Sequence, residues 1–551
     1  MELLSAAENS LATAIRSQNS ILNSFFLTPT DEDEINILIK NLKPESSPGI
    51  DKCTPVLIKQ ISKFILIPIT HIFNLSLSSG TFPECWKTAV VTPIYKSGDK
   101  SVPSNYRPIS LLPIFSKLLE KIVNNRLITF LEAQDLIPAR QFGFRHGKST
   151  EDAVLTVSDI VTNALDNNLN CLGVFIDLAK AFDTVSIPIL LRKLEYCGVR
   201  GVALEWFRTY LANRSQCTRI GRDCSDRLQV NFGVPQGSIL GPTLFIIYIS
   251  DILQLQLRGA EMVCYADDTV ILFQDHSWEN VYEKAEEGMA IVANWLKLNL
   301  LTVNVDKTKH IAFHKTRASK PPDSLFIKIH SCNEQSPNHA ICTCQVVKRT
   351  ATIKYLGIVL DEKLSYKNHI TATSNRLRKA TYIFKALRHS ASKNTLLLVY
   401  KAICQSILMY CIKVWGGTIK TSMIELERAQ RSVLKVMLSK PFRFSTNLLF
   451  RECKVLRVRQ LFILRATMYV HKITLKSPDH DNMTKQRVYK VPVRRVRTAF
   501  AKRHPSYLLA WLYNRACRSI NIKSASAREA KLTIESWLMN LDYMETEQLL
   551  H

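Results

Sequence analysis

The sequence predicts an α+β protein, because two kinds of hydrophobic pattern divide the chain. Apolar runs rich in β-branched and aromatic residues, typical of buried strands, occur around Cys171–Val185 and Cys264–Leu272. After residue 375, apolar and basic residues alternate with helical spacing, as in "NRLRKATYIFKALRH". With 551 residues, of which 46% are hydrophobic and 22% charged, the chain is long enough for roughly two to four globular domains.

The stretch "CYADDTVIL", Cys264–Leu272, predicts a β-hairpin with two adjacent aspartates at its tip. The flanking runs have strand composition, and "ADD" is typical of a tight turn. A solvated turn is one explanation of the aspartate pair. The alternative is a bound cation, since like charges at contact distance otherwise repel, and hard divalent cations such as Mg²⁺ prefer oxygen ligands. A metal site at Asp267 and Asp268 requires a further carboxylate.

The stretch "CLGVFIDLAKAFDTV", Cys171–Val185, supplies a candidate for that carboxylate. A buried strand is expected to end at Asp177, and "AKAFDTV" is expected to turn into a helix. An acidic residue at the end of an apolar strand is costly unless it is bonded, so Asp177 either caps the next helix or binds a metal. Asp183 is a second candidate. Only a sheet that places the two strands side by side would bring Asp177 to the predicted hairpin.

A glycine- and proline-rich loop lies between these two strands. In "NFGVPQGSILGPTLFIIYISDI", Asn231–Ile252, glycines and prolines mark a loop that a ligand can approach closely, and the apolar run after it predicts a helix. Gln236 is the side chain near the apex of the loop that has both a donor and an acceptor. A purely structural turn explains the glycines equally well.

The positive charge is concentrated in the last third of the chain. The net charge is +26 and the pI is about 9.5. Residues 376 to 551 hold 34 Lys and Arg against 10 Asp and Glu, which leaves a net of only +2 for residues 1 to 375. No acidic residue occurs from Asn482 to Arg528. Because a solvated helical face normally mixes both signs, this region is expected to contact nucleic-acid phosphates.

The remaining features favour an intracellular protein. The 14 cysteines are scattered, and the cluster of His330, Cys332, His339, Cys342 and Cys344 matches no zinc spacing, so free thiols in a reducing nuclear or cytoplasmic compartment are expected. The start of the chain lacks a signal peptide pattern. The apolar run "FILIPITHIFNLSL" is interrupted by Pro68, His71 and Asn74, is shorter than a membrane span and is expected to be a buried helix, with no membrane partner.

The order "VFIDLAKAFDTV", "GVPQGSILGPTLF" and "YADD" resembles the successive palm motifs of reverse transcriptases. The detail is similar to the non-LTR (LINE-like) retrotransposon branch, particularly jockey-type elements. Upstream, "LKPESSPGIDKCTPVLIK", "NYRPISLL" and "QFGFRHGKSTEDAV" look like N-terminal and finger motifs. Downstream, "NWLKLNLLTVNVDKTKHIAF" and "IKYLGIVLDEKLSYKNHI" look like the last palm motif and the primer grip. The resemblance covers about residues 35 to 375 in unbroken order.

The resemblance implies a right-hand polymerase fold with fingers, an antiparallel-sheet palm with helices behind it, a helical thumb and a basic, mainly helical C-terminal extension. The expected division is an N-terminal extension at 1–34, fingers and palm at 35–375, a thumb at 376–465 and a basic region at 466–551. The implied function is an RNA-directed DNA polymerase that extends a DNA primer on an RNA template from dNTPs. Two Mg²⁺ ions are implied, with Mn²⁺ able to substitute.

The resemblance also implies individual roles. Asp177, Asp267 and Asp268 match the metal-binding triad. Phe182 matches the aromatic residue that excludes a ribose 2′-hydroxyl, although without the resemblance a buried core Phe is the better interpretation. Lys307 matches a proposed proton donor to pyrophosphate, with Lys309 close enough to be the alternative. The implied nucleotide and primer contacts are Gln236, Gly237, Arg107, Lys96 and Tyr265.

The chain departs from the family pattern at three points, of which the last two limit the implied function. Cys411, in "ILMYCIKVWGGT", stands where a glycine is often found. No endonuclease precedes the first polymerase motif and no Cys/His knuckle follows, so the chain is expected to be a truncated copy. A non-catalytic nucleic-acid-binding relic is therefore the alternative function, and a group II intron-type maturase is a weaker one. The sequence leaves the oligomeric state open.

Overall fold

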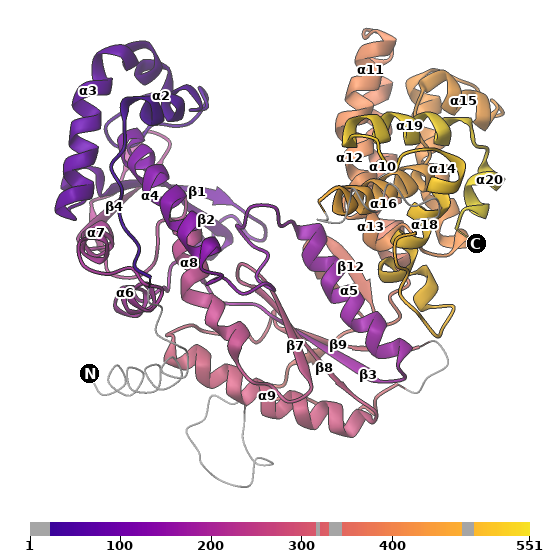
Figure 1. Ribbon diagram of the computed structural model, residues 1–551, viewed down its shortest axis with the longest axis horizontal. Helices are drawn as coiled ribbons and strands as arrows, with labels where there is room; N and C mark the ends of the chain where they lie inside the picture. Colours follow the sequence, from indigo (N-terminus) through magenta and orange to yellow (C-terminus); the bar gives the residue numbers. More distant parts are fainter. Residues whose placement is uncertain (1–22, 316–319, 330–343, 477–489, 551) are drawn as a thin grey trace.

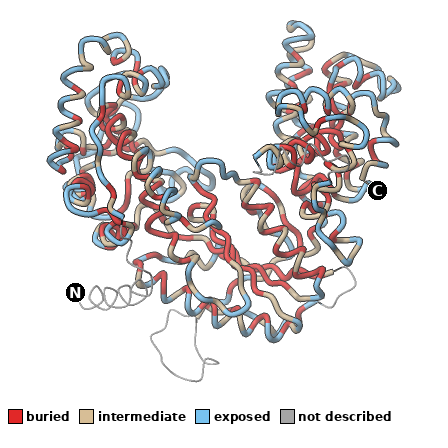
Figure 2. Tube along the Cα trace, in the orientation of Figure 1, coloured by how far each residue is buried: buried red, intermediate tan, exposed pale blue. Residues whose placement is uncertain are grey.

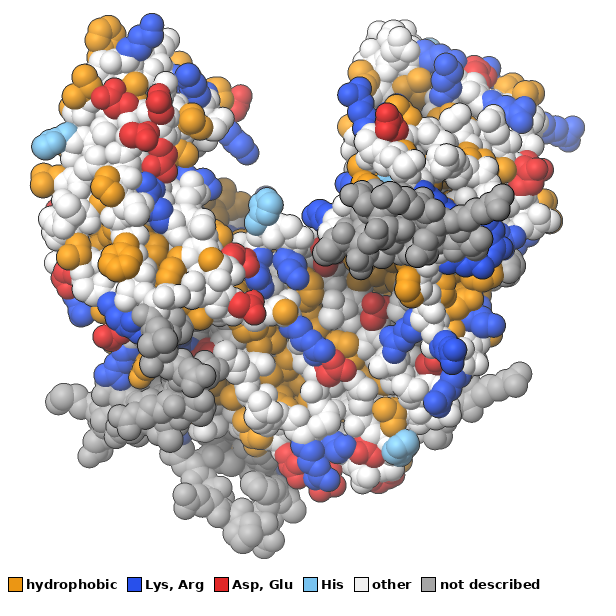
Figure 3. Space-filling model, viewed as in Figure 1, with side chains coloured by type: hydrophobic (Ala, Val, Ile, Leu, Met, Phe, Trp, Pro, Cys, Tyr) orange, Lys and Arg blue, Asp and Glu red, His pale blue; other side chains and the backbone are white. Residues whose placement is uncertain are grey.

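The chain forms two lobes that rise from a central β-sheet, as the computed structural model shows (Figure 1). The structure describes residues 23–315, 320–329, 344–476 and 490–550. The N-terminal lobe holds helices α2 to α4 and a second sheet, and the C-terminal lobe holds the helices from α10 onward. The space-filling view shows an open hollow between the two lobes, above the central sheet (Figure 3).

The central sheet has the strand order β10-β9-β3-β8-β7. Its strands are β3 (Asn170–Ile176), β7 (Ala260–Tyr265), β8 (Asp268–Asp275), β9 (Lys309–Phe313) and β10 (Lys348–Arg349). Strand β3 is antiparallel to both β8 and β9, and β7 and β8 form a hairpin. The strands predicted around Asp177 and the Asp267 hairpin are therefore confirmed, and the sheet places them side by side.

Helices cover both faces of this sheet. Successive side chains of β3 point to opposite faces and so enter two different hydrophobic cores. Cys171 and Phe175 face the core that contains α5 (Thr150–Asp166), whereas Leu172 and Ile176 face the core of α8 and α9. The helix predicted after the glycine-rich loop is confirmed as α8 (Gly241–Ile249), and α9 is Trp278–Leu298. Figure 2 shows the continuous buried layer that results.

The N-terminal lobe combines helices with a second sheet of order β2-β1-β4-β5, in which β6 also pairs with β4. The strands are β1 (Thr88–Tyr95), β2 (Tyr106–Leu111), β4 (Arg214–Ile220), β5 (Asp223–Cys224) and β6 (Leu228–Val230). The helices are α2 (Glu32–Lys40), α3 (Pro55–Ser79), α4 (Ile114–Ala133), α6 (Ile187–Tyr196) and α7 (Val202–Leu211). Short 3₁₀ turns lie at Glu84–Trp86, Pro103–Asn105 and Ser250–Gln254.

The apolar run around Pro68 forms a helix, as predicted, but the prediction that this helix is buried was wrong. Helix α3 continues through Pro68 for 25 residues, and only 17% of its most apolar stretch is buried. One face, including Phe73, packs into the lobe, whereas Phe64 and Ile67 are 83% and 69% exposed. By length and composition alone, α3 is the one helix in the described ranges that would reach across a bilayer.

The segment "AKAFDTV" also differs from its prediction. Residues 179 to 185 form turns rather than a helix, and the next helix, α6, begins only at Ile187. Lys180 has a φ of 51°, in the left-handed region that a continuing right-handed helix excludes. This turn brings Phe182 and Asp183 back toward the glycine-rich loop.

The C-terminal lobe is helical, which confirms the spacing observed after residue 375. A β-ribbon of β11 (Thr352–Tyr355) and β12 (Ile358–Asp361) precedes it. Its helices are α10 (Lys367–Leu387), α11 (Lys393–Tyr400), a π-helical turn (Lys401–Gln405), α12 (Ser406–Met409), α13 (Ile412–Trp415), α14 (Lys420–Met437), α15 (Thr446–Cys453), α16 (Val458–Leu475), α18 (Pro505–Ser519), α19 (Ala527–Asn540) and α20 (Tyr543–Gln548), with a 3₁₀ turn at Ala501–Arg503.

Helix α16 is the centre of this lobe and runs across the boundary expected at residue 465. Helices α18, α19 and α20 pack on it. The buried Arg459 guanidinium donates to Glu547 at 2.8 Å and to the backbone oxygen of Thr418 at 2.6 Å, which ties α20 to the start of α14. A buried ion pair of this kind needs such additional hydrogen bonds to offset its desolvation.

A segment with little regular secondary structure, residues 490 to 503 and hereafter the strap, joins the C-terminal lobe to helix α5. The Asp166 carboxylate accepts hydrogen bonds from the backbone N–H groups of Arg497 and Thr498, both at 2.9 Å. The Asn514 side chain exchanges two 2.8 Å hydrogen bonds with the backbone of Val491. Arg494 in the strap contacts Asn163 of α5. The basic segment predicted from composition is thus held in place by backbone contacts.

The cysteines of the described residues are free, as expected for a reducing compartment. His330, Cys332, His339 and Cys342 lie outside the described residues. Cys411 is buried and has a φ of 49° and a ψ of 29°, in the left-handed region. Glycine is the residue that adopts this conformation without a steric penalty, so a glycine at this position would fit the backbone better than Cys411 does.

Candidate active site

The two central-sheet strands that carry aspartates meet at one end of the sheet. Tyr265 of β7 pairs with Asp268 of β8, so that Ala266 and Asp267 form a two-residue turn. Ile176 of β3 pairs with Thr269 of β8, and neighbouring strands lie about 4.8 Å apart. Asp177, the residue after β3, therefore lies beside Asp268. The structure brings together the three aspartates that the sequence singled out.

The carboxylates of this cluster repel one another. Burial raises the pKa of Asp267, and the charge of Asp177 raises it further, whereas Lys96 and Arg107 lower it. Burial also raises the pKa of Asp268, to about 6, with added contributions from Asp267 and Asp177. A cation placed among the three carboxylates would relieve this repulsion.

The three aspartates can supply oxygen ligands to a hard divalent cation but do not enclose one. Within the described ranges, no three or more His, Cys, Asp or Glu side chains are gathered tightly enough to hold a metal ion alone. Mg²⁺ is commonly bound by one or two carboxylates together with substrate phosphates rather than by a cage of protein ligands. The donor set therefore fits Mg²⁺ if a phosphate-bearing substrate completes the coordination.

Backbone contacts fix Asp177 to the loop that precedes β9. The Asp177 N–H donates to the Thr308 hydroxyl at 3.2 Å, and the Asp177 carbonyl accepts from the Asn304 N–H at 2.8 Å. Lys307 lies in this loop and is exposed, whereas Lys309 is the half-buried first residue of β9. Lys307, the predicted proton donor, therefore lies on a segment that is hydrogen-bonded to Asp177, a predicted metal ligand.

A support for the Asp267 turn was missed by the sequence reasoning. The fully buried Gln141 accepts, through Oε1, the N–H groups of Ala266 and Gly143, both at 3.0 Å. Phe142 and Arg140 add backbone hydrogen bonds to Cys264 of β7. Ala266 has a φ of 56°, unusual for a residue other than glycine, so this segment holds a strained turn in place. In the sequence, "QFGF" indicated only a resemblance to a finger motif and not this contact with the turn.

Gly143 permits this close approach. A Cβ atom at Gly143 would lie 2.2 Å from the backbone nitrogen of Ala266. The amide nitrogen Nε2 of Gln141 has no hydrogen-bond partner within the described part of the chain. The side-chain hydrogen bonds of Gln141 thus go to Ala266 in the Asp267 turn and to Gly143, which packs against that turn.

Phe182 is half-buried and packed rather than free. Its ring stacks on Phe245 of α8, with centroids 4.3 Å apart and planes 19° apart, and meets Phe144 edge-on at 6.2 Å. Its backbone oxygen accepts from the Val234 N–H at 2.9 Å. The ring is therefore held in one orientation between α8 and the glycine-rich loop, five residues after Asp177.

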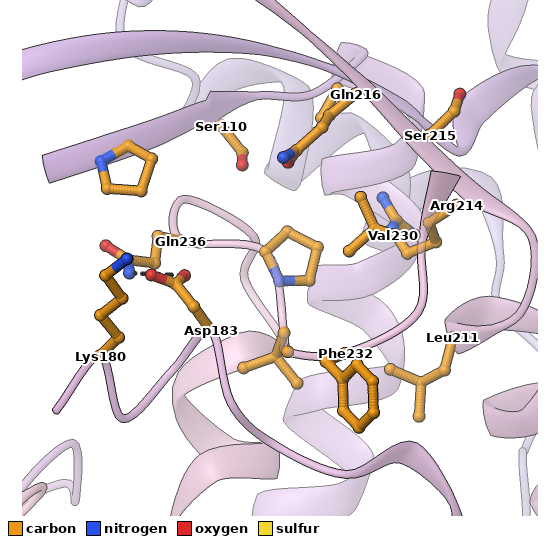
Figure 4. A pocket seen from close by; sticks show the side chains of 15 residues that line it. Ser110, Lys180, Asp183, Leu211, Arg214, Ser215, Gln216, Val230, Phe232 and Gln236 are labelled. Atoms are coloured by element: carbon orange, nitrogen blue, oxygen red, sulfur yellow. Dashed lines mark hydrogen bonds between the residues drawn. The ribbon is translucent and has the colours of Figure 1, made fainter. Parts of the chain in front are cut away.

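The glycine-rich loop borders a pocket of about 290 Å³, which lies between the sheet of the N-terminal lobe and the turn after β3 (Figure 4). Gln236 donates to the Asp183 carboxylate at 2.8 Å, and its backbone oxygen accepts from the Ser110 N–H at 2.7 Å. Burial raises the pKa of Asp183, and the Gln236 hydrogen bond partly offsets this. Gly237 has a φ of 128°, and a Cβ there would lie 2.5 Å from the Ser110 oxygen, so glycine is required.

Three other residues with predicted roles lie near the aspartate cluster. Arg107 lies on β2, and Lys96 follows β1 in the same hairpin, with its N–H donating to the Asn105 carbonyl at 2.9 Å. Both side chains are exposed, and both act electrostatically on Asp267. Tyr265 ends β7 directly before the turn. Two cations from the N-terminal lobe and three carboxylates of the central sheet thus share one region.

Comparison with known proteins agrees with this geometry. Residues 94–360 match the family model described as "Reverse transcriptase (RNA-dependent DNA polymerase)". This part of the chain is therefore similar to reverse transcriptases, and several relatives of the chain are named as RNA-directed DNA polymerases of transposons or mobile elements. The matched segment includes all of the predicted active-site residues.

Two of these relatives come from Drosophila melanogaster. The probable RNA-directed DNA polymerase from transposon BS is 28% identical over 493 residues, covering 86% of this chain and 52% of the relative. The RNA-directed DNA polymerase from mobile element jockey is 27% identical over 490 residues, covering 86% and 51%. The chain spans about half the length of the curated relatives it matches.

Proposed function

We propose that this chain is an RNA-directed DNA polymerase that extends a DNA 3′-hydroxyl on an RNA template from dNTPs. The observation that carries the proposal is the convergence of Asp177, Asp267 and Asp268 at one end of the central sheet, within the part of the chain that is similar to reverse transcriptases. In this proposal the N-terminal lobe serves as fingers, the central sheet as palm and residues 376–465 as thumb, flanked by extensions at 1–34 and 466–551.

The aspartate cluster would hold two Mg²⁺ ions, replaceable by Mn²⁺. Bound there, the ions would activate the primer hydroxyl and neutralise the triphosphate and pyrophosphate. Asp177 and Asp267 are the proposed metal ligands, and Asp268 completes the triad. Most of the catalytic effect in phosphoryl transfer comes from positioning and charge stabilisation, which suits a cluster fixed by backbone hydrogen bonds.

The surrounding side chains are proposed to position the nucleotide. The exposed Arg107 and Lys96 would bind the triphosphate, for which the planar Arg fork is well suited. Phe182, held against Phe245, would occupy the space of a ribose 2′-hydroxyl. Gln236 and Gly237 would contact the nucleotide, and Tyr265 the primer end. Lys307, with Lys309 as the alternative, would protonate the leaving pyrophosphate.

The excess of positive charge after residue 375 supports binding of a template and primer by the C-terminal lobe. Phosphate contacts of this kind release counterions, so binding should weaken as the salt concentration rises. An intracellular location, with no membrane partner, is part of the same proposal.

Primer extension by the purified chain tests the proposal. The wild type should incorporate dTTP on poly(rA)/oligo(dT) with Mg²⁺, and Asp267→Asn should abolish incorporation while leaving binding intact. Asp135→Asn is a matched control, because Asp135 is exposed at the end of α4 and has a φ of 50°, which Asn tolerates. Binding of the template–primer without incorporation above the Asp267→Asn level would support the non-catalytic relic instead.

A further inference from the structure

A large basic groove on the C-terminal lobe is lined by residues from the region of α10, from α14 and from the loop that leads to α15. Figure 1 shows where these helices lie in the lobe. Its volume is about 1180 Å³. Of the 15 residues that line it, seven are Lys or Arg and none is Asp or Glu. We call this site the basic groove; the side chains used below are Arg378, Arg428, Arg431, Lys435, Phe442 and Arg443.

The positive charge of the basic groove is largely uncompensated. Among the described residues, Lys440 is the one groove cation with a carboxylate within 4 Å, which is Glu452 at 2.9 Å. Burial lowers the pKa of Lys435, and the neighbouring Arg431 lowers it further. Like charges crowded on one helix face destabilise the free protein, whereas a bound polyanion would relieve their repulsion.

The cations are arranged along one face of α14. Arg428, Arg431 and Lys435 are three and four residues apart, so they project from the same side of the helix over about 10 Å. The Arg431 guanidinium donates to the Thr446 hydroxyl at 3.3 Å, which orients it across the groove. Arg378 on α10 lines the groove as well. A row of this kind fits successive phosphates of a polynucleotide.

An aromatic ring lies at the edge of this row. Phe442 is 93% exposed, the highest value among the large apolar side chains of the described residues. The Lys435 ammonium lies 5.6 Å from its ring centroid and donates to its backbone oxygen, so the segment that carries the ring is fixed to α14. A partner that covered this ring would gain free energy by removing its apolar surface from water.

The Phe442 ring and the groove cations together predict a preference for single-stranded over double-stranded nucleic acid. A duplex presents its phosphates but buries the faces of its bases, so it gains little from Phe442. A single strand presents phosphates to the cations and free base faces to the ring, and base–aromatic stacking is tolerant of sequence. We propose that the basic groove binds single-stranded nucleic acid, with phosphates along α14 and a base stacked on Phe442.

This site goes beyond the proposed polymerase function, because it does not require catalysis. It would hold an unpaired strand on the same lobe that is proposed to contact the template–primer duplex. The strand could be RNA or DNA, since both present the same phosphates and base faces. Oligonucleotides rU12 and dT12 distinguish the two sources.

Fluorescence anisotropy with the full chain tests the proposal. The probes are labelled rU12, labelled dT12 and a 12-bp duplex. Phe442→Ala should weaken binding of at least one single strand about 5- to 100-fold and leave duplex binding within twofold. Phe442→Trp should retain single-strand affinity, because it preserves the ring. Arg428→Gln should lower the slope of log affinity against log salt by about 0.7 for a single strand.

The matched control is Phe64→Ala, which removes another highly exposed ring, 83% exposed, from α3 on the opposite lobe. It should leave single-strand affinity unchanged. Equal losses in Phe442→Ala and Phe64→Ala, equal losses for single strand and duplex, or single-strand affinity within twofold of wild type in Phe442→Ala would each overturn the proposal. Binding to Asp267→Asn separates it from polymerisation, because the proposed site requires the Phe442 effect to persist there.

Discussion

The contact between Gly143 and the Asp267 turn leads to a quantitative prediction for Gly143→Ala. The added methyl group would lie 2.2 Å from the Ala266 nitrogen, whereas real Cβ atoms essentially never come within 3.0 Å of another atom, so the two must separate by at least 0.8 Å. The shift would disturb the buried Gln141 hydrogen bonds to Ala266 and Gly143. An unpaired buried N–H costs about 1 to 3 kcal/mol, so the variant should be about 2 kcal/mol less stable.

The same shift should affect activity more than stability, because Asp267 follows Ala266 directly. A misplacement of about 1 Å can cost roughly 100-fold in rate, and that is the loss expected for dTTP incorporation. The Mg²⁺ concentration for half-maximal rate should rise as well. Primer-extension rates across a Mg²⁺ titration, together with urea unfolding, measure both effects.

Gly147→Ala is the matched control for this prediction. Gly147 lies in the same connection, has a φ of 73° and has nothing within 4 Å of an added Cβ. Its replacement should cost about 1 kcal/mol from left-handed strain and leave the Mg²⁺ requirement unchanged. If Gly143→Ala loses stability but keeps its rate and Mg²⁺ requirement, the segment does not position Asp267 and the reasoning fails.

Three further results are expected. Phe182→Ala should relax discrimination between dNTP and rNTP, measured by competing incorporation; unchanged discrimination would refute the proposed role. Burial raises the pKa of Glu427 to about 7, so its contribution to stability is complete below about pH 4.5 and is lost as the pH rises through 7. Glu427→Gln should therefore match the wild type near pH 4.5 and exceed it by about 3 kcal/mol at pH 8 in urea unfolding, whereas a pH-independent difference would contradict this. Cys411→Val should cost about 2 kcal/mol and Cys411→Gly less than about 1 kcal/mol, because only valine worsens the left-handed strain; equal costs would argue against strain.

The strands and the aspartate cluster were predictable because their signals are local. The apolar run before Asp177 and the β-branched runs around Asp267 each determine a strand, and family motifs supplied the pairing that spacing alone leaves open. The helical pattern after residue 375 was equally clear. The roles of the predicted active-site residues remain predictions, since geometry places the side chains without testing their chemistry.

The predictions that were wrong or absent concern features that the local sequence pattern does not determine. The exposure of α3 depends on which neighbours cover it, and composition does not encode that. The turn at Lys180 replaces a helix through a left-handed residue, which is uncommon for lysine. Gln141 was missed because its function depends on a contact with Ala266, 125 residues further along the chain. A buried glutamine before a glycine was a weak signal that the sequence did contain.

The bond between the strap and Asp166 has a consequence for biosynthesis. Asp166 and Arg497 are 331 residues apart. During synthesis, helix α5 is therefore made long before the strap that binds Asp166. At typical translation rates this delay is roughly 20 to 70 seconds. During that time one side of α5 and the adjoining face of the sheet lack their final cover, which exposes a nascent chain to aggregation. Chaperone demand during synthesis should therefore fall sharply once residues 490 to 503 have left the ribosome.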